Sequence, residues 1–245
     1  PAPNRAPAPA AVRSVAPTGE GDGRLVALLR RNRWLRRGLS TASTAAILVA
    51  VAIIGYPFYT NLYAERLQGQ LERDFDSPDL DQAYSDCREL RRGDPGCQIQ
   101  DGDSLTRILI PDIDVDVVVV EGVSPSALRA GAGHYPSTPL PCEAGNVAIA
   151  GHRTTYGRPF HNLDLLTEVS ELQPGSRITL EIPIGECTYE VTDIRIVAPT
   201  EVGVIAPTPD NQLTLTTCHP KGSAAQRLIV TARLVEGLLP PAAPA

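Results

Sequence analysis

The sequence contains no methionine and a single lysine, Lys221, among its 245 residues. Because translation starts at methionine, we expect that Pro1 is not the natural start and that some sequence precedes it. Arginine supplies the remaining positive charge, a bias associated with bacterial genomes rich in G and C. No two of the five cysteines show the C-x2-4-C spacing typical of zinc sites, so we expect no metal and no other cofactor.

The main part of the chain, residues 65–245, lacks the excess of positive charge that binding to nucleic acid needs. The formal net charge of −6 divides into +6 for residues 1–37, zero for residues 38–64 and −12 for the rest of the chain. A surface that binds phosphates must be cationic, so the acidic main part excludes nucleic acid as a partner. The basic N-terminal segment needs another explanation.

Residues 38–64 form the one long uncharged and largely apolar run. About 20 helical residues, at about 1.5 Å each, cross a bilayer core of about 30 Å. Arginines precede this run and Glu65 is the first charge after it, so the positive-inside rule predicts a single-pass protein of the cell membrane with a cytoplasmic N-terminus and an extracellular main domain. The alternatives are a buried helix of a soluble protein and a cleaved signal peptide. The later run Leu234–Leu239 is too short for a second span.

The cysteines fit a location outside the cytoplasm, where disulfides persist and an odd number leaves one thiol over. Cys87 and Cys97 lie ten positions apart in a polar stretch, whereas Cys142 and Cys187 flank predicted strands. We predict the disulfides Cys87–Cys97 and Cys142–Cys187, with Cys218 free. The alternative is that these four cysteines are unpaired structural thiols.

From Leu105 onward, short apolar runs alternate with turn residues. Short helices are expected over 124–131 and around 162–166. A series of short strands with only short helices between them predicts an all-β barrel or sandwich. The predicted strands cover residues 106–111, 115–122, 146–152, 177–183, 187–197, 212–218 and 226–235.

Three candidate catalytic side chains lie at the ends of predicted strands. Cys218 ends TLTTC, His152 ends NVAIAGH, and Arg227 opens the last strand. A thiol with an ordinary pKa of about 8.5 needs a basic neighbour to become a nucleophilic thiolate. His152 can serve as that base and then protonate a leaving amine, and Arg227 can hydrogen-bond the oxyanion. The alternative is an unpaired structural cysteine and a surface arginine.

Two segments, LTLTTCHPKGSAAQRLIVTARL and AIAGHRTTYGRPFHNLDLL, resemble the TLxTC…R and catalytic-histidine segments of the sortases, over about residues 105–236. GHYP, GHRTTYG and TTCHP are similar to the class E sortases of actinobacteria. The resemblance implies an eight-stranded β-barrel and assigns the catalytic roles to His152, Cys218 and Arg227.

The resemblance also implies a reaction. A secreted protein's C-terminal sorting motif, of the LAxTG or LPxTG type, is cleaved after Thr through a Cys thioester, and the protein passes to an amine of the peptidoglycan precursor. The alternatives are a pilin-polymerising sortase whose acceptor is a pilin lysine, a cysteine hydrolase that releases the acyl group to water, and a non-enzymatic scaffold barrel with a vestigial site.

Several other residues are weaker candidates. Thr217 is expected to orient the site or help hold the oxyanion, and Tyr135 is expected to line the substrate groove or to pack. We expect His134, His161 and His219 to be structural or surface residues.

Asp112, Asp114 and Asp116 form a D-x-D-x-D run. This run lacks the glycine and bidentate glutamate of a calcium loop, so it is interpreted as a solvated strand face.

The predicted organisation has five parts. They are a disordered basic cytoplasmic tail (1–37), a transmembrane helix (38–64), an extracytoplasmic stalk or possible flap (65–104), the catalytic barrel (105–236) and a disordered tail (237–245).

Overall fold

The computed structural model describes residues 31–89, 96–129, 131–153, 158–170 and 173–237. Most of the two predicted disordered tails lies outside the described residues, as does the middle of the predicted flap. The chain divides into two compact units, residues 1–55 and 56–245, which are described separately.

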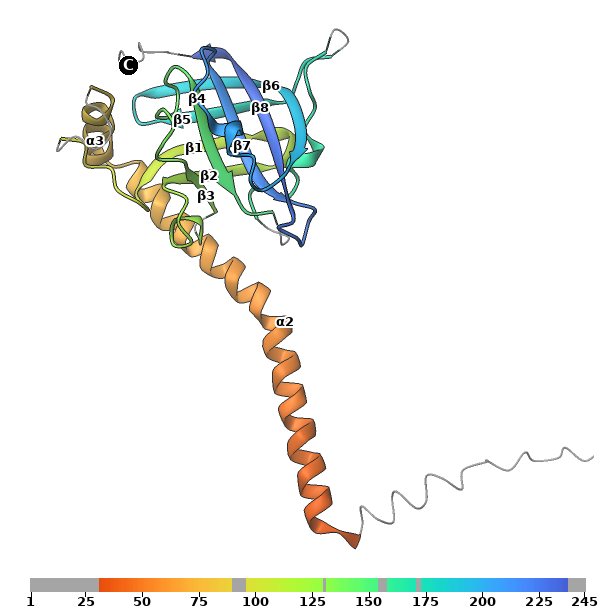
Figure 1. Ribbon diagram of the computed structural model, residues 1–245. Coiled ribbons are helices and arrows are strands. Elements are labelled where there is room, and N and C mark those ends of the chain that lie inside the picture. Colours follow the sequence, from red (N-terminus) through yellow and green to blue (C-terminus); the bar gives the residue numbers. More distant parts are fainter. Residues whose placement is uncertain (1–30, 90–95, 130, 154–157, 171–172, 238–245) are drawn as a thin grey trace, which may run out of the picture. The chain divides into compact units, whose positions relative to one another are not determined.

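In the first unit the structure describes residues 31–55, and nearly all of them belong to helix α2 (Arg33–Phe75). This helix continues into the second unit (Figure 1). Its most apolar 18-residue window has a mean hydropathy of 1.9, and none of that window is buried against other protein. The hydroxyls of Thr41 and Thr44 donate to carbonyls of the preceding turn, which satisfies these polar groups within the helix itself. By length and composition α2 can cross a membrane, and it extends beyond the predicted end of the span at Ala64.

In the second unit, the last turns of α2 pack against the strands. Leu71 is buried with Val118, Val120 and Ala127. The side-chain amide of Gln68 donates to the carbonyl of Val118 and accepts from its N–H, at 3.0 and 2.9 Å. The end of α2 therefore covers strand β2 and satisfies part of its backbone.

Helix α3 (Pro78–Glu89) follows after a short turn. Ser77 caps it by accepting from the N–H of Leu80, proline occupies the first helical position, and Asp79 and Asp81 place negative charge in the first turn. All three features favour a helix start. Tyr84 on this helix is fully buried against the strands.

Eight strands close into a barrel in the order β1-β2-β3-β4-β7-β8-β6-β5 (Figure 1). Two neighbouring pairs are parallel, β2 with β3 and β4 with β7, and the other pairs are antiparallel. This confirms the predicted eight-stranded fold with short helices. The strands are β1 (Ser104–Ile110), β2 (Val115–Glu121), β3 (Ala132–His134), β4 (Asn146–Gly151), β5 (Arg177–Ile182), β6 (Gly185–Val197), β7 (Gln212–His219) and β8 (Gln226–Gly237).

Burial follows the sequence pattern strand by strand. All six residues of β4 are buried, as its continuous apolar run requires. The first strand, β1, alternates in its second half, and its inward side chains Ile108 and Ile110 join the main core. A single apolar core therefore fills the barrel.

The structure differs from the expectations in two local elements. Strand β3 was not predicted, and the helix expected over residues 124–131 is only the 3-10 turn η2 (Ala127–Arg129). The short helix around 162–166 is present as η3 (Leu163–Leu165), and two further 3-10 turns are η1 (Pro111–Ile113) and η4 (Val202–Ile205).

Candidate active site

Three neighbouring strands, β4, β7 and β8, bring the predicted catalytic residues to one edge of the barrel. Strands β4 and β7 run parallel, and Ala150 pairs with Thr216. In a parallel pair, residues two positions further along remain side by side and on the same face, at an interstrand spacing of about 4.8 Å. The ladder ends at that pair, and His152, directly after β4, and Cys218 each lie two residues beyond it.

Cys218 also has a direct neighbour on its other side. On the antiparallel strand β8 its partner is Arg227. Directly paired residues project to the same face, with Cα atoms about 5 Å apart. Cys218 and Arg227 are therefore direct neighbours, and His152 directly follows β4, the strand on the other side of β7.

The Cys218 thiol is free and partly exposed. His152 is also partly exposed. Burial, and then the positive charge of Arg158, lower the pKa of the His152 imidazole below its ordinary value of 6.5. The neutral ring that this favours can accept a proton from a neighbouring thiol.

The Arg227 guanidinium is held by the loop before its strand. Its Nη1 donates to the carbonyls of Ala224 and Gln226, at 2.9 and 3.0 Å. A guanidinium carries five N–H donors, so the N–H groups of Nε and Nη2 remain for a substrate oxygen.

The two weaker candidates make bonds within the fold. The Thr217 hydroxyl is buried and donates to the carbonyl of Gly151 at 2.7 Å. Because a hydroxyl has one proton, this bond uses its donor to fix the backbone beside His152. Tyr135 is partly exposed, and its phenol oxygen lies 2.9 Å from the hydroxyl of Thr216.

Arg153 was not selected from the sequence, yet it is only 2% exposed and its side chain contacts the backbone of Cys218. Its Nη1 contacts the Cys218 carbonyl at 3.4 Å and Nδ1 of His219 at 3.1 Å. Its Nε donates to the His161 carbonyl, and its Nη2 pairs with Asp164 at 2.9 Å. Nothing in the sequence marked it, because arginine is ordinarily an exposed residue.

The histidines expected to be structural do make structural contacts. His134 is fully buried between the carboxylate of Glu121 at 2.9 Å and the carbonyl of Pro139 at 2.8 Å. Nδ1 of His161 donates to the Arg153 carbonyl, and Nδ1 of His219 accepts from Arg153.

The D-x-D-x-D run is solvated, as expected, but most of it is not a strand face, because Asp112 lies in η1, Asp114 directly follows that turn and only Asp116 lies in β2. Asp112, Asp114 and Asp116 are all exposed. Asp112 accepts a hydrogen bond from the hydroxyl of Ser176, and Asp116 pairs with Arg107.

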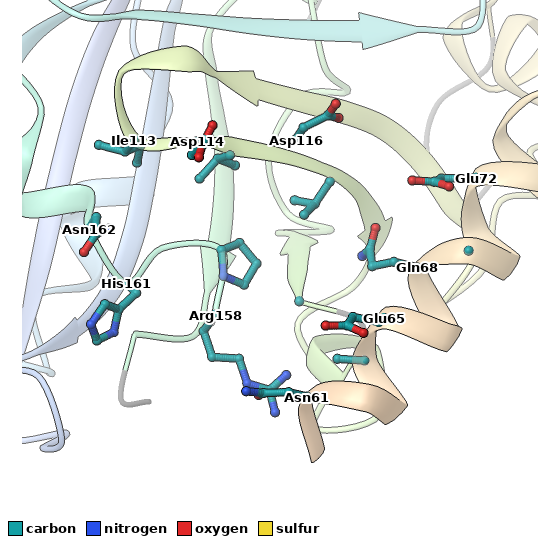
Figure 2. A pocket seen from close by; sticks show the side chains of 16 residues that line it. Asn61, Glu65, Gln68, Glu72, Ile113, Asp114, Asp116, Arg158, His161 and Asn162 are labelled. Carbon is teal, nitrogen blue, oxygen red and sulfur yellow. The ribbon is translucent and has the colours of Figure 1, made fainter. Parts of the chain in front are cut away.

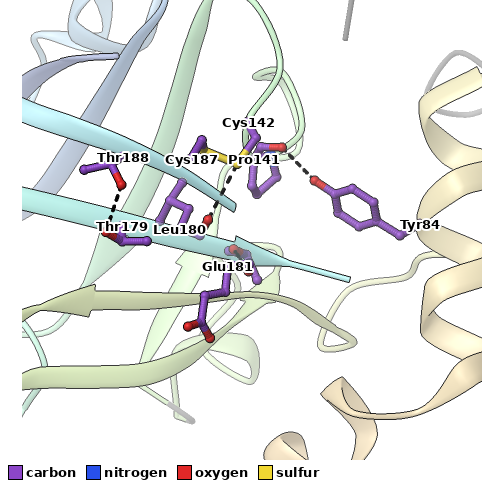
Figure 3. The surroundings of a disulfide bond; sticks show 9 residues. Tyr84, Pro141, Cys142, Thr179, Leu180, Glu181, Cys187 and Thr188 are labelled. Carbon is purple, nitrogen blue, oxygen red and sulfur yellow. Dashed lines mark hydrogen bonds between the residues drawn. A yellow bond between two sulfur atoms is a disulfide. The ribbon is translucent and has the colours of Figure 1, made fainter. Parts of the chain in front are cut away.

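The opposite end of the barrel carries both predicted disulfides. Cys142 is bonded to Cys187 and Cys87 to Cys97. Cys187 pairs with Gly237, at the other end of β8 from Arg227. The Tyr84 hydroxyl donates to the Pro141 carbonyl beside this disulfide (Figure 3). Helix α3 is thus attached far from Cys218.

A groove of about 590 Å³ lies between α2 and the strands. Arg158 extends across it toward Asn61, and Glu65, Gln68 and Glu72 line the helical wall (Figure 2). His161 contributes to the opposite wall, so the groove borders the loop that follows His152.

The chain is similar to known proteins over this barrel. The sortase domain family model matches residues 108–235. Sortase SrtE1 of Streptomyces coelicolor is 32% identical over 158 residues, which are 58% of this chain and 43% of that protein. Sortase D of Bacillus subtilis is 32% identical over 130 residues, 51% of this chain and 61% of that protein. The match thus spans about half the length of these two relatives.

A solved structure agrees with the fold. A Clostridium perfringens Sortase D5 transpeptidase superposes with a TM-score of 0.55 and 26% identity, covering 70% of this chain and 98% of that one.

Proposed function

The chain belongs to the sortase family, and on this basis we propose that it is a membrane-anchored cysteine transpeptidase. It would cleave a C-terminal sorting motif of the LAxTG or LPxTG type in a secreted protein and transfer that protein to an amine of the peptidoglycan precursor. The observations that support the proposal are the pairing of Cys218 with Arg227 and the parallel register of β4 and β7, whose last pair lies two residues before both His152 and Cys218.

The first half of the reaction forms a thioester. Neutral His152, favoured by its lowered pKa, accepts the thiol proton, and the Cys218 thiolate attacks the carbonyl carbon of the motif's Thr–Gly bond. The negative charge that develops on the carbonyl oxygen is stabilised by Nε and Nη2 of Arg227 and by backbone N–H groups. The imidazolium of His152 then protonates the leaving glycine nitrogen as the C–N bond breaks.

The second half regenerates the thiol. The acceptor amine attacks the thioester carbonyl and loses a proton to His152. The C–S bond then breaks, and the proton returns to the Cys218 sulfur. The net change is the exchange of one amide for another, so no cofactor is needed.

The location is part of the proposal. An apolar helix with a dense arginine group before it supports a single-pass membrane protein with a cytoplasmic N-terminus. Two disulfides in the main domain support a catalytic domain outside the cytoplasm.

The test uses the whole chain in detergent, incubated with an LAxTG peptide and weighed by mass spectrometry with and without an added amine such as diaminopimelate. The expected results are a thioester adduct on Cys218 and an amide product that needs the amine. Cys218→Ala should form neither. Turnover by that variant would refute the thiolate mechanism, and formation of the free acid alone in the presence of amine would instead identify a hydrolase.

A further inference from the structure

Side-chain hydrogen bonds join the end of β4 and the residues after it to the end of β7, beyond the last backbone pair of the two strands. The regular ladder ends at the pair Ala150–Thr216. Next, the Thr217 hydroxyl donates to the Gly151 carbonyl at 2.7 Å. Beyond that, the Arg153 guanidinium reaches the Cys218 carbonyl and the His219 ring. His152 thus lies between two side-chain links to the chain that carries Cys218.

The Arg153 link is fixed on all sides. Its Nη1 contacts the end of β7, its Nε bonds the His161 carbonyl at 3.3 Å, and its Nη2 pairs with Asp164. Its own carbonyl accepts from Nδ1 of His161, so side chain and backbone hold the same neighbour. A buried planar fork with several fixed acceptors has little freedom to move.

We propose that Arg153 is a positioning residue that sets the separation and orientation of the His152 imidazole relative to the Cys218 thiol. The inference rests on the proposed function of these two residues. Arg153 follows His152 directly in the chain, and its fork ends on the carbonyl of Cys218 itself. A shift of this link moves one partner relative to the other.

Two substitutions separate position from folding. Arg153→Lys keeps the charge and loses the fork, because one ammonium group cannot reach all the acceptors on residues 161–164 and 218–219. Asp164→Asn keeps Arg153 and weakens its anchor. The matched control is Lys221→Gln, which removes the exposed second partner of Asp164, at 3.4 Å, and leaves the Arg153 bonds in place.

The first measurement is steady-state turnover of an LAxTG peptide by the whole chain in detergent. A misplacement of about 1 Å can cost roughly 100-fold in rate. We expect Arg153→Lys to lower kcat by roughly 30- to 100-fold with KM within about twofold, Asp164→Asn to lower kcat less, and Lys221→Gln to match the wild type.

The second measurement needs no peptide and therefore does not depend on the proposed substrate. The rate of Cys218 alkylation by iodoacetamide is followed against pH, with His152→Ala as the reference for an uncoupled thiol. We expect the Arg153→Lys profile to move toward that of His152→Ala. A wild-type profile in Arg153→Lys overturns the proposal, as does a fall in kcat that only matches a smaller folded fraction. A remaining outcome is that neither the wild type nor Arg153→Lys turns over the peptide while the pH profile of Cys218 alkylation still moves as expected. In that case the failure lies in the proposed substrate.

Discussion

At one end of the barrel a disulfide joins Cys142 to Cys187 beside the fully buried Tyr84. At the other end, the three candidate catalytic side chains are partly exposed, and two buried polar side chains beside them donate to backbone carbonyls. The first end is closed by covalent and apolar contacts, whereas the second presents a thiol, an imidazole and a guanidinium to solvent.

This difference separates stability from chemistry. Apolar burial and cross-links constrain the chain without requiring any particular group to be reactive. A reacting thiol must be accessible, so its neighbourhood relies on directed polar bonds for precision. Substitutions at the disulfide end should therefore change unfolding, and substitutions at the catalytic end should change rate.

The largest expected effect is at the disulfide end. Replacing Cys142 and Cys187 by serine opens a loop with a sequence separation of 45. The chain-entropy estimate for such a loop is about 4 kcal/mol of unfolding free energy. Urea unfolding of the whole chain should show this loss, with kcat of the folded protein unchanged. Replacing the control pair Cys87 and Cys97, whose sequence separation is 10, should cost about 3 kcal/mol of unfolding free energy. A large fall in kcat in either variant would contradict the division between stability at the disulfide end and chemistry at the catalytic end.

The next effect is at the catalytic end. A Cβ placed on Gly151 would collide with the Phe160 ring. Gly151→Ala must therefore displace the backbone next to His152, and we expect roughly a 100-fold loss of kcat/KM, equivalent to about 2.7 kcal/mol in the barrier. Gly203→Ala is the control, since its nearest new contact is an ordinary 3.7 Å.

A second substitution sharpens that result. Adding Phe160→Leu to Gly151→Ala makes room for the new methyl group and should restore part of the rate. Failure of the double variant to recover would mean that the collision does not act through His152.

A smaller effect is expected from one hydrogen bond at the disulfide end. Tyr84→Phe keeps the buried ring and removes the bond to the Pro141 carbonyl, which is 2.7 Å long. We expect a loss of about 1 kcal/mol in unfolding free energy and no change in kcat. Gln82→Ala, at an exposed position of the same helix, is the control and should be neutral.

Most of the strands could be predicted from the sequence because alternation and apolar runs are local. Strand β3 could not, since three residues, Ala132–His134, are too few to show a period, and its pairing with β2 and β4 is set by distant segments. The start of the predicted stalk, from residue 65, is the end of α2, which continues to Phe75. Its last turns are polar in sequence and are held by contacts from Leu71 and Gln68 to β2, 47 or more residues away.

The candidate catalytic residues could be predicted as residue types at strand ends. The strand register and the hydrogen bonds that surround them could not. The parallel pairing of β4 with β7 ends two residues before both His152 and Cys218, and no local pattern encodes that register. Thr217 was expected to act on the substrate or to orient the site, and its bond to Gly151 favours the second role. Arg153 was missed because its partners, His161, Asp164 and Cys218, become neighbours only in the fold.

The smallest expected effect tests whether the polar end also contributes to stability. Burial alone would raise the pKa of Asp164, but the hydrogen bond and charge of Arg153 outweigh it, so the pKa lies below its ordinary 3.8. Asp164 therefore adds stability that is fully present above about pH 4 and is lost as the pH falls through the lowered value. Because its side chain is 35% exposed, solvent screens the pair, and we expect Asp164→Asn to cost only roughly 0.5 kcal/mol at pH 7. Thermal unfolding of wild type and variant should converge below pH 3. A difference that persists there would mean that the asparagine disturbs packing rather than charge, and that the polar end stabilises the barrel by the same means as the disulfide end.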